Sequence, residues 1–118
     1  MAAEETFEIT LLLPDGSTRV VQVAADEPIL VAAYRDGLDE LPSTCLQGWC
    51  LTCAGRVEGA GDWDQSLSRR YFPQDHEAGF ILPCTALPRS DLVIRTHQRE
   101  AMVENRIRLG LPAPRGKW

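Results

Sequence analysis

Four cysteines are the residues of this 118-residue chain whose type and spacing could do chemistry. Cys45, Cys50 and Cys53 lie within nine residues of one another, and thirty residues separate Cys53 from Cys84. Thiolates bind zinc or iron–sulfur clusters, and paired cysteines form structural or redox-active disulfides. Because the N-terminal segment has no features of a secretory signal, we expect a reducing compartment, where clustered cysteines favour a metal site.

The order Cys-x4-Cys-x2-Cys followed by a distant cysteine is an established ligand spacing for [2Fe–2S] clusters. A loop can supply three thiolates and a strand elsewhere the fourth. Such a centre is negatively charged, so the loop must direct N–H donors at the sulfurs. Gly48 permits close approach of the backbone, and Gly55 is expected to relax the chain after the third ligand. The hydroxyl groups of Thr44 and Thr52 can add donors.

A structural zinc site is the main alternative, because Cys50 and Cys53 form a Cys-x2-Cys pair. Zinc ribbons usually carry a second such pair, which this sequence lacks. Four cysteines could also form two disulfides, but a reducing compartment disfavours them. A thioredoxin-like redox pair would not need the other two cysteines. A Rieske centre would need His76 or His97 in a ligand pair with a cysteine, and neither has that spacing. We expect both histidines to be surface residues or to lie beside the ligands.

The sequence of the N-terminal third predicts the strands and the helix that must position these cysteines. Alternating apolar residues over 6–13 and again over 18–23 flank the turn sequence Pro-Asp-Gly-Ser, which predicts an antiparallel hairpin. A helix is expected next: Asp26 can cap it, Pro28 fits its first turn and Gly37 ends it. Two strands followed by a crossing helix indicate an α+β roll.

The remaining sequence predicts shorter elements. Residues 38–53 have no periodicity and should form the ligand loop, followed by short strands at 54–59, 80–84 and 91–96. One helical turn is expected before Pro73. A C-terminal helix is expected over 97–109, with four apolar residues on one side: Met102, Val103, Ile107 and Leu109.

Composition and charge restrict the class of function. The chain is 44% hydrophobic and 25% charged, which is typical of one globular domain, and it has no apolar run of the roughly 20 residues that span a membrane. Residues 1–43 carry nine acidic and two basic side chains, whereas residues 44–118 carry eight acidic and ten basic. This distribution argues against nucleic-acid binding and indicates protein partners of complementary charge.

Two stretches, LPSTCLQGWCLTCAGRV and HEAGFILPCTALPRSDLVIRTHQRE, make the chain similar to the plant-type [2Fe–2S] ferredoxins, particularly those of cyanobacteria. The resemblance covers about residues 6–100. It implies a β-grasp fold with a mixed sheet, one main helix and a cluster-binding loop. We therefore divide the chain into a ferredoxin domain, residues 1–100, and a C-terminal extension of helix and tail, residues 101–118.

The resemblance also implies a site and a function. Cys45, Cys50, Cys53 and Cys84 match the four ligands of the family's cluster. The protein would then be a monomeric carrier of one electron at low potential, and not an enzyme. Its partners would be ferredoxin-dependent reductases or oxidoreductases, or photosystem I, in the cytoplasm of a bacterium, with a cyanobacterium favoured. The alternative is a β-grasp module that binds zinc, or whose cluster senses iron or redox state.

The chain departs from the family at the ligand loop and on its acidic surface. Leu46, Trp49 and Leu51 replace an arginine and two small residues, so the rim of the loop becomes apolar. We expect this apolar rim to lower the reduction potential of the cluster. Three arginines interrupt the acidic surface that ferredoxins present to reductases, which favours a specialised acceptor: Arg69, Arg70 and Arg99.

Overall fold

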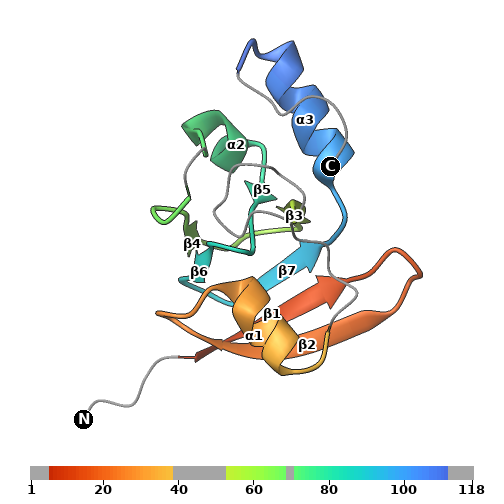
Figure 1. The fold of residues 1–118 in the computed structure, drawn as a ribbon, viewed down its shortest axis with the longest axis vertical. Coiled ribbons are helices and arrows are strands. Elements are labelled where there is room, and N and C mark those ends of the chain that lie inside the picture. The colour runs from red at the N-terminus through yellow and green to blue at the C-terminus, as the bar shows by residue number, and fades with distance from the viewer. Residues whose placement is uncertain (1–5, 39–52, 69–70, 112–118) are drawn as a thin grey trace.

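The computed structural model describes residues 6–38, 53–68 and 71–111 (Figure 1). The elements follow in this order: β1 (Thr6–Leu12), β2 (Thr18–Ala24), α1 (Ile29–Arg35), β3 (Gly55–Val57), β4 (Trp63–Asp64), α2 (Pro73–Glu77), β5 (Phe80–Ile81), β6 (Leu87–Pro88), β7 (Leu92–Arg95) and α3 (Arg99–Arg108). Strands and helices share one structure, which confirms the α+β prediction. No helix among these residues is both long and apolar enough to span a membrane.

The main sheet is mixed and has the strand order β2-β1-β7-β3-β5. The predicted hairpin is confirmed: β1 and β2 are antiparallel, with Ile9 opposite Val21, and Gly16 adopts a positive φ of 90° in the turn. β1 pairs in parallel with β7, whereas β3 is antiparallel to both β7 and β5. β4 and β6 form a separate two-stranded sheet. The β3–β7 pairing joins the hairpin half of the sheet to the half that leads to Cys84.

The core lies between α1 and the sheet, and α1 crosses β1 and β2 (Figure 1). Alternate residues of β1, β2 and β7 face this core, as the period of two predicts. The fully buried residues at this contact are Ile9, Leu11, Val21, Val23, Ile29, Leu30, Ala32, Ala33, Leu92 and Ile94.

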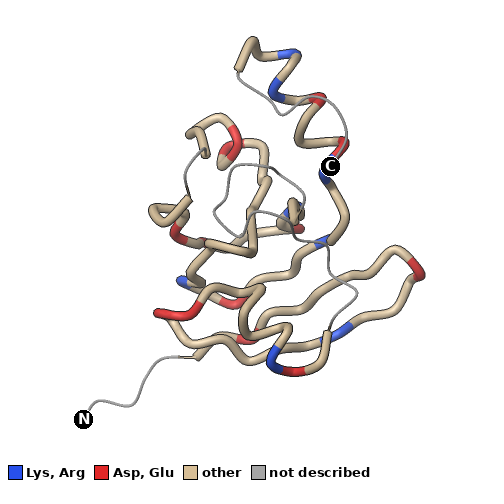
Figure 2. The backbone as a smooth tube through the Cα atoms, viewed as in Figure 1, with Lys and Arg blue, Asp and Glu red and all other residues tan. Residues whose placement is uncertain are grey.

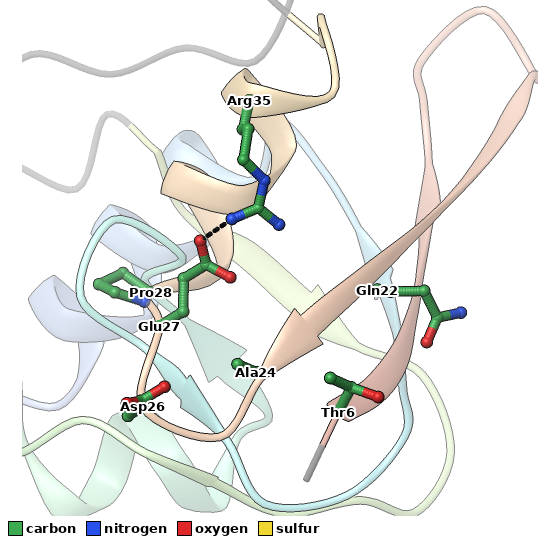
Figure 3. A pocket seen from close by; sticks show the side chains of 7 residues that line it. All are labelled: Thr6, Gln22, Ala24, Asp26, Glu27, Pro28 and Arg35. Atoms are coloured by element: carbon green, nitrogen blue, oxygen red, sulfur yellow. Dashed lines mark hydrogen bonds and ion pairs between the residues drawn. The ribbon is translucent and has the colours of Figure 1, made fainter. Parts of the chain in front are cut away.

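The start of α1 differs from the prediction. Pro28 is the N-cap residue and no side chain caps the helix, so the role predicted for Asp26 is wrong. The N–H groups of Ile29 and Leu30 instead donate to the carbonyls of Ala86 and Pro83, at 3.0 and 2.9 Å. Glu27 next to Pro28 pairs with Arg35 at the other end of the helix (Figure 3). A contact distant in sequence therefore satisfies the first helical N–H groups.

The helical turn near Pro73 also lies elsewhere than predicted. α2 begins at Pro73 and does not precede it. Proline suits the first position of a helix because its nitrogen has no hydrogen to leave unpaired. The Asp75 carboxylate accepts a 2.9 Å hydrogen bond from the Phe72 N–H and so closes the N-terminus of the helix.

The C-terminal helix forms as predicted, but a different face is buried. Met102 is buried, yet Ile107 and Leu109 are 56% and 49% exposed. In their place Arg106 is fully buried against α2. Its Nη2 lies 2.8 Å from Oδ2 of Asp75, its Nε lies 3.2 Å from Oδ1, and its guanidinium carbon lies 4.9 Å from the centre of the Phe72 ring.

This buried pair shows that α3 packs on the body of the fold. Residues 101–108 of the expected extension belong to α3, whereas residues 112–118 lie outside the described residues. The division of the chain at residue 100 stays a prediction.

Gly55 does not have the role expected of it. Its φ is not positive, so the chain does not need glycine there for its backbone conformation. A Cβ at this position would lie 2.7 Å from Cγ2 of Ile94 and 3.1 Å from the carbonyl oxygen of Arg95. Glycine is therefore required because β3 packs closely against β7.

Replacing Arg106 should destabilise the protein strongly. Arg106→Met leaves the Asp75 carboxylate buried without its cation, and a broken buried pair costs about 3–5 kcal/mol. Urea unfolding of the holoprotein, followed by circular dichroism, measures this. The control is Arg95→Met, which removes a pair with Glu58 whose side chains are 53% and 42% exposed and should cost less than about 1 kcal/mol. Equal losses in the two variants would contradict the assignment.

Gly55→Ala should also destabilise the protein, by about 1–3 kcal/mol, because the added methyl group overpacks the contact between β3 and β7. The same unfolding measurement applies. Gly110→Asn is the control, because Gly110 has open space around its Cα and a φ of 75° that asparagine tolerates. A Gly55→Ala protein as stable as the control would show that the contact is loose.

Candidate metal centre

Two of the four predicted ligands lie in the described part of the chain. Cys53 precedes β3 and Cys84 follows β5, and the two residues are 8% and 6% exposed. Both belong to the buried core cluster of the described residues. Cys45 and Cys50 lie within residues 39–52, outside the described residues, as do Gly48 and the apolar rim.

The pairing of β3 with β5 brings the two cysteine segments together. Gly55 lies opposite Ile81 and Arg56 opposite Phe80 in an antiparallel ladder. Cys53 is two residues before Gly55 and Cys84 three after Ile81. In an antiparallel pair these two directions lead to the same end of the ladder. The pairing of β3 with β5 therefore places Cys53 and Cys84 beyond the same end of the ladder.

Hydrogen bonds inside the turn that carries Cys84, and hydrogen bonds from α1, fix the backbone of this turn. The N–H groups of Thr85 and Ala86 both donate to the Leu82 carbonyl, at 3.1 and 3.0 Å. The carbonyls of Pro83 and Ala86 accept the first N–H groups of α1. On another side, the Leu82 N–H donates to Oε1 of Gln65 at 2.6 Å. The backbone around Cys84 is thus fixed by hydrogen bonds to two other segments.

The segment of Cys53 is held by α3 and by packing. The carbonyl of Ala54 accepts a 2.8 Å hydrogen bond from the N–H of Gln98, next to the start of α3. His97, the residue before Gln98, has a φ of 60°, which turns the chain from β7 into the helix. Cys53 also lines a small apolar pocket with Leu30 and Pro83.

Tyr71 contacts β5 from the segment before α2. Its hydroxyl donates to the carbonyl of Phe80, and burial raises its pKa. His76 stacks on Trp63 with ring centres 4.2 Å apart. Nδ1 of His97 lies 2.7 Å from Oγ1 of Thr96. The histidines therefore contact neighbouring side chains, and neither belongs to a group of three metal-ligating residues in the described part of the chain.

The donor set fits an iron–sulfur cluster. Soft thiolates in apolar surroundings favour iron–sulfur or zinc over the oxygen-liganded cations. Within the described residues, no disulfide joins Cys53 to Cys84. The spacing of Cys45 and Cys50 would supply the two further thiolates that a two-iron centre needs.

Several residues that hold this site were not predicted. Gln65 binds the Leu82 backbone, and Ser68 and Thr85 complete a polar network beside Cys84. Polar residues in an irregular segment carry no periodic signal, so no pattern in the sequence distinguishes them.

Comparisons with known proteins agree with this geometry. The chain matches the family model of the 2Fe-2S iron-sulfur cluster binding domain over residues 12–89, which include all four cysteines. It is 38% identical over 99 residues to "Ferredoxin-6, chloroplastic" of Zea mays, covering 84% of this chain and 63% of the relative. It is 34% identical over 97 residues to "Ferredoxin-2" of a Synechococcus, covering 82% and 90%.

A solved structure shares the fold. The crystal structure of pectocin M2 superimposes with a TM-score of 0.73 at 25% identity, over 84% of this chain and 35% of that one. The chain thus spans only part of the pectocin chain and less than two thirds of the maize relative. The mixed sheet with its crossing helix confirms the predicted β-grasp fold. The chain belongs to the family of 2Fe-2S iron–sulfur cluster binding domains.

Proposed function

We propose that this protein is a one-electron carrier whose [2Fe–2S] cluster is bound by Cys45, Cys50, Cys53 and Cys84. The observation that carries the proposal is the β3–β5 ladder, which brings the buried Cys53 and Cys84 segments to one end of the sheet. Membership of the cluster-binding family supports the cofactor. The names of the maize and Synechococcus relatives support electron transfer as the function, in place of enzymatic catalysis.

The residues of this chain contribute binding, rigidity and exclusion of water. The bound cluster supplies a centre that accepts and releases one electron. Cys53 and Cys84 hold it from segments whose backbones are fixed by α1, by Gln65 and by Gln98. A fixed backbone limits the change in geometry that accompanies a change in charge. The apolar core around both sulfurs limits the access of water, which is one determinant of potential.

The cluster should be visible and should depend on the cysteines. Purified holoprotein should be red-brown, with two irons and two sulfides per chain, and should give a reversible one-electron wave in voltammetry. Cys84→Ala should lose the colour and the wave because one iron loses a thiolate. Val93→Ala, at an exposed position of β7, should keep both. A colourless protein with one zinc per chain would show instead that the cysteines form a zinc site.

Redox proteins are the expected partners, and a reductase or photosystem I is the proposed donor or acceptor. Acidic residues of the described N-terminal half lie at the hairpin turn and at both ends of α1, whereas α3 carries acidic and basic residues along its length (Figure 2). The acidic residues of the N-terminal half support docking through that side, with a weaker contact where arginines lie among the acidic residues. Arg69 and Arg70 lie outside the described residues.

We also propose that the protein works as a monomer in the cytoplasm of a cyanobacterium. The similarity to the Synechococcus relative supports a cyanobacterial source. The chloroplastic name of the maize relative supports a plastid instead. Fractionation of the source cells distinguishes the two, and light scattering of the holoprotein measures its mass.

The apolar rim should lower the potential. Reduction adds a negative charge, which apolar surroundings disfavour. The double variant Trp49→Ala and Leu51→Ser should therefore raise the midpoint potential, by an amount of the order of the 59 mV that corresponds to a tenfold change for one electron. The control is Leu67→Ala, at a position 55% exposed outside the ligand loop. An unchanged midpoint in the double variant would rule out a role of the rim in setting the potential.

A further inference from the structure

Three polar side chains form a hydrogen-bond network on the turn that carries Cys84. Oγ of Ser68 lies 2.6 Å from Oγ1 of Thr85, and Nε2 of Gln65 lies 2.8 Å from Oγ of Ser68 and 3.3 Å from Oγ1 of Thr85. Thr85 is only 5% exposed. Its Oγ1 also lies 3.9 Å from Sγ of Cys84, within the range of a hydrogen bond that involves sulfur. The network thus connects Gln65 to a predicted cluster ligand.

The orientation of the Gln65 amide is fixed by the backbone. The Leu82 N–H can only donate, and it lies 2.6 Å from one amide atom of Gln65, which must therefore be Oε1. Nε2, a donor with two hydrogens, then points toward Ser68 and Thr85. Gln65 is consequently the donor at that end of the network.

The direction of the remaining bonds follows from counting donors. Either hydroxyl of the Ser68–Thr85 pair could be the donor. Oγ of Ser68 accepts from Gln65, and Thr85 is the hydroxyl of the two that has further acceptors within reach, so both hydrogens have an acceptor when Ser68 donates to Thr85. In that arrangement Thr85 accepts from both neighbours and directs its own hydrogen elsewhere. Two acceptors are within reach, the Leu82 carbonyl at 3.4 Å and Sγ of Cys84 at 3.9 Å. The Leu82 carbonyl already accepts from the N–H groups of Thr85 and Ala86.

We infer that Thr85 donates its hydroxyl hydrogen to Sγ of Cys84 when this sulfur is a metal-bound thiolate, and that Gln65 and Ser68 are positioning residues that direct the hydrogen there. A charged thiolate is a stronger acceptor than a carbonyl that already accepts two hydrogen bonds. A donor to a ligand sulfur stabilises the more negative, reduced form and so raises the midpoint potential. The inference rests on the proposed function, because it needs a cluster at Cys84.

The test replaces the hydroxyl group with a methyl group of the same shape. In the holoprotein, Thr85→Val should lower the equilibrium constant for reduction by up to about tenfold, which is a fall in midpoint of about 59 mV. Thr85→Ser, which keeps a hydroxyl, should restore most of the wild-type value. Ser68→Ala should lower the midpoint less, because Gln65 still directs the Thr85 hydroxyl. Thr10→Val in β1 is the matched control and should not change it.

A spectroscopic measurement separates this role from a merely structural one. The iron–sulfur stretching bands in the resonance Raman spectrum should shift when wild-type protein is transferred to heavy water, and part of that shift should be absent in Thr85→Val. If Thr85→Val does not assemble a cluster, Ser68→Ala carries the test. A midpoint of Thr85→Val, or in that case of Ser68→Ala, equal to that of Thr10→Val, with reversible reduction retained, would overturn the inference and leave the proposed function standing. A wild-type protein without reversible reduction would overturn both.

Discussion

The antiparallel pairing of β3 with β5 is the interaction on which the site depends, because it joins two segments that the sequence separates by thirty residues. Gly55 opposite Ile81 fixes the register, and that register places Cys53 and Cys84 beyond the same end of the ladder. The ladder is short, so its position relies on β7, which pairs with the other edge of β3. Gly55 permits that approach, since any side chain there would meet Ile94.

The rest of the fold holds the two cysteine segments in place. α1 donates its first N–H groups to the Cys84 turn, and Gln65 binds the same turn from another side. α3 contacts both halves: Gln98 before its first residue binds the carbonyl next to Cys53, and Arg106 binds Asp75 in α2, which leads into β5. The C-terminal helix therefore contacts the segments that support the site.

Local patterns predicted much of this structure. The alternation over residues 6–13 and 18–23 predicted the hairpin because a half-buried strand repeats every two residues. Errors arose where distant contacts decide the outcome. The helix cap assigned to Asp26 is replaced by carbonyls near Cys84, and the apolar face assigned to α3 is replaced by Arg106, whose partner Asp75 lies 31 residues away. No local pattern reports such pairs, and the same holds for the network of Gln65 with Thr85.

The central claim is that the sulfurs of Cys53 and Cys84 bind the same cluster. The most direct measurement is electron paramagnetic resonance of the reduced protein in which one of these cysteines is replaced by selenocysteine enriched in selenium-77. Either replacement should broaden or split the signal through hyperfine coupling, because unpaired spin is shared with directly bound ligands. A signal identical to that of the sulfur protein, at either position, would show that the residue does not bind the cluster and would contradict the account.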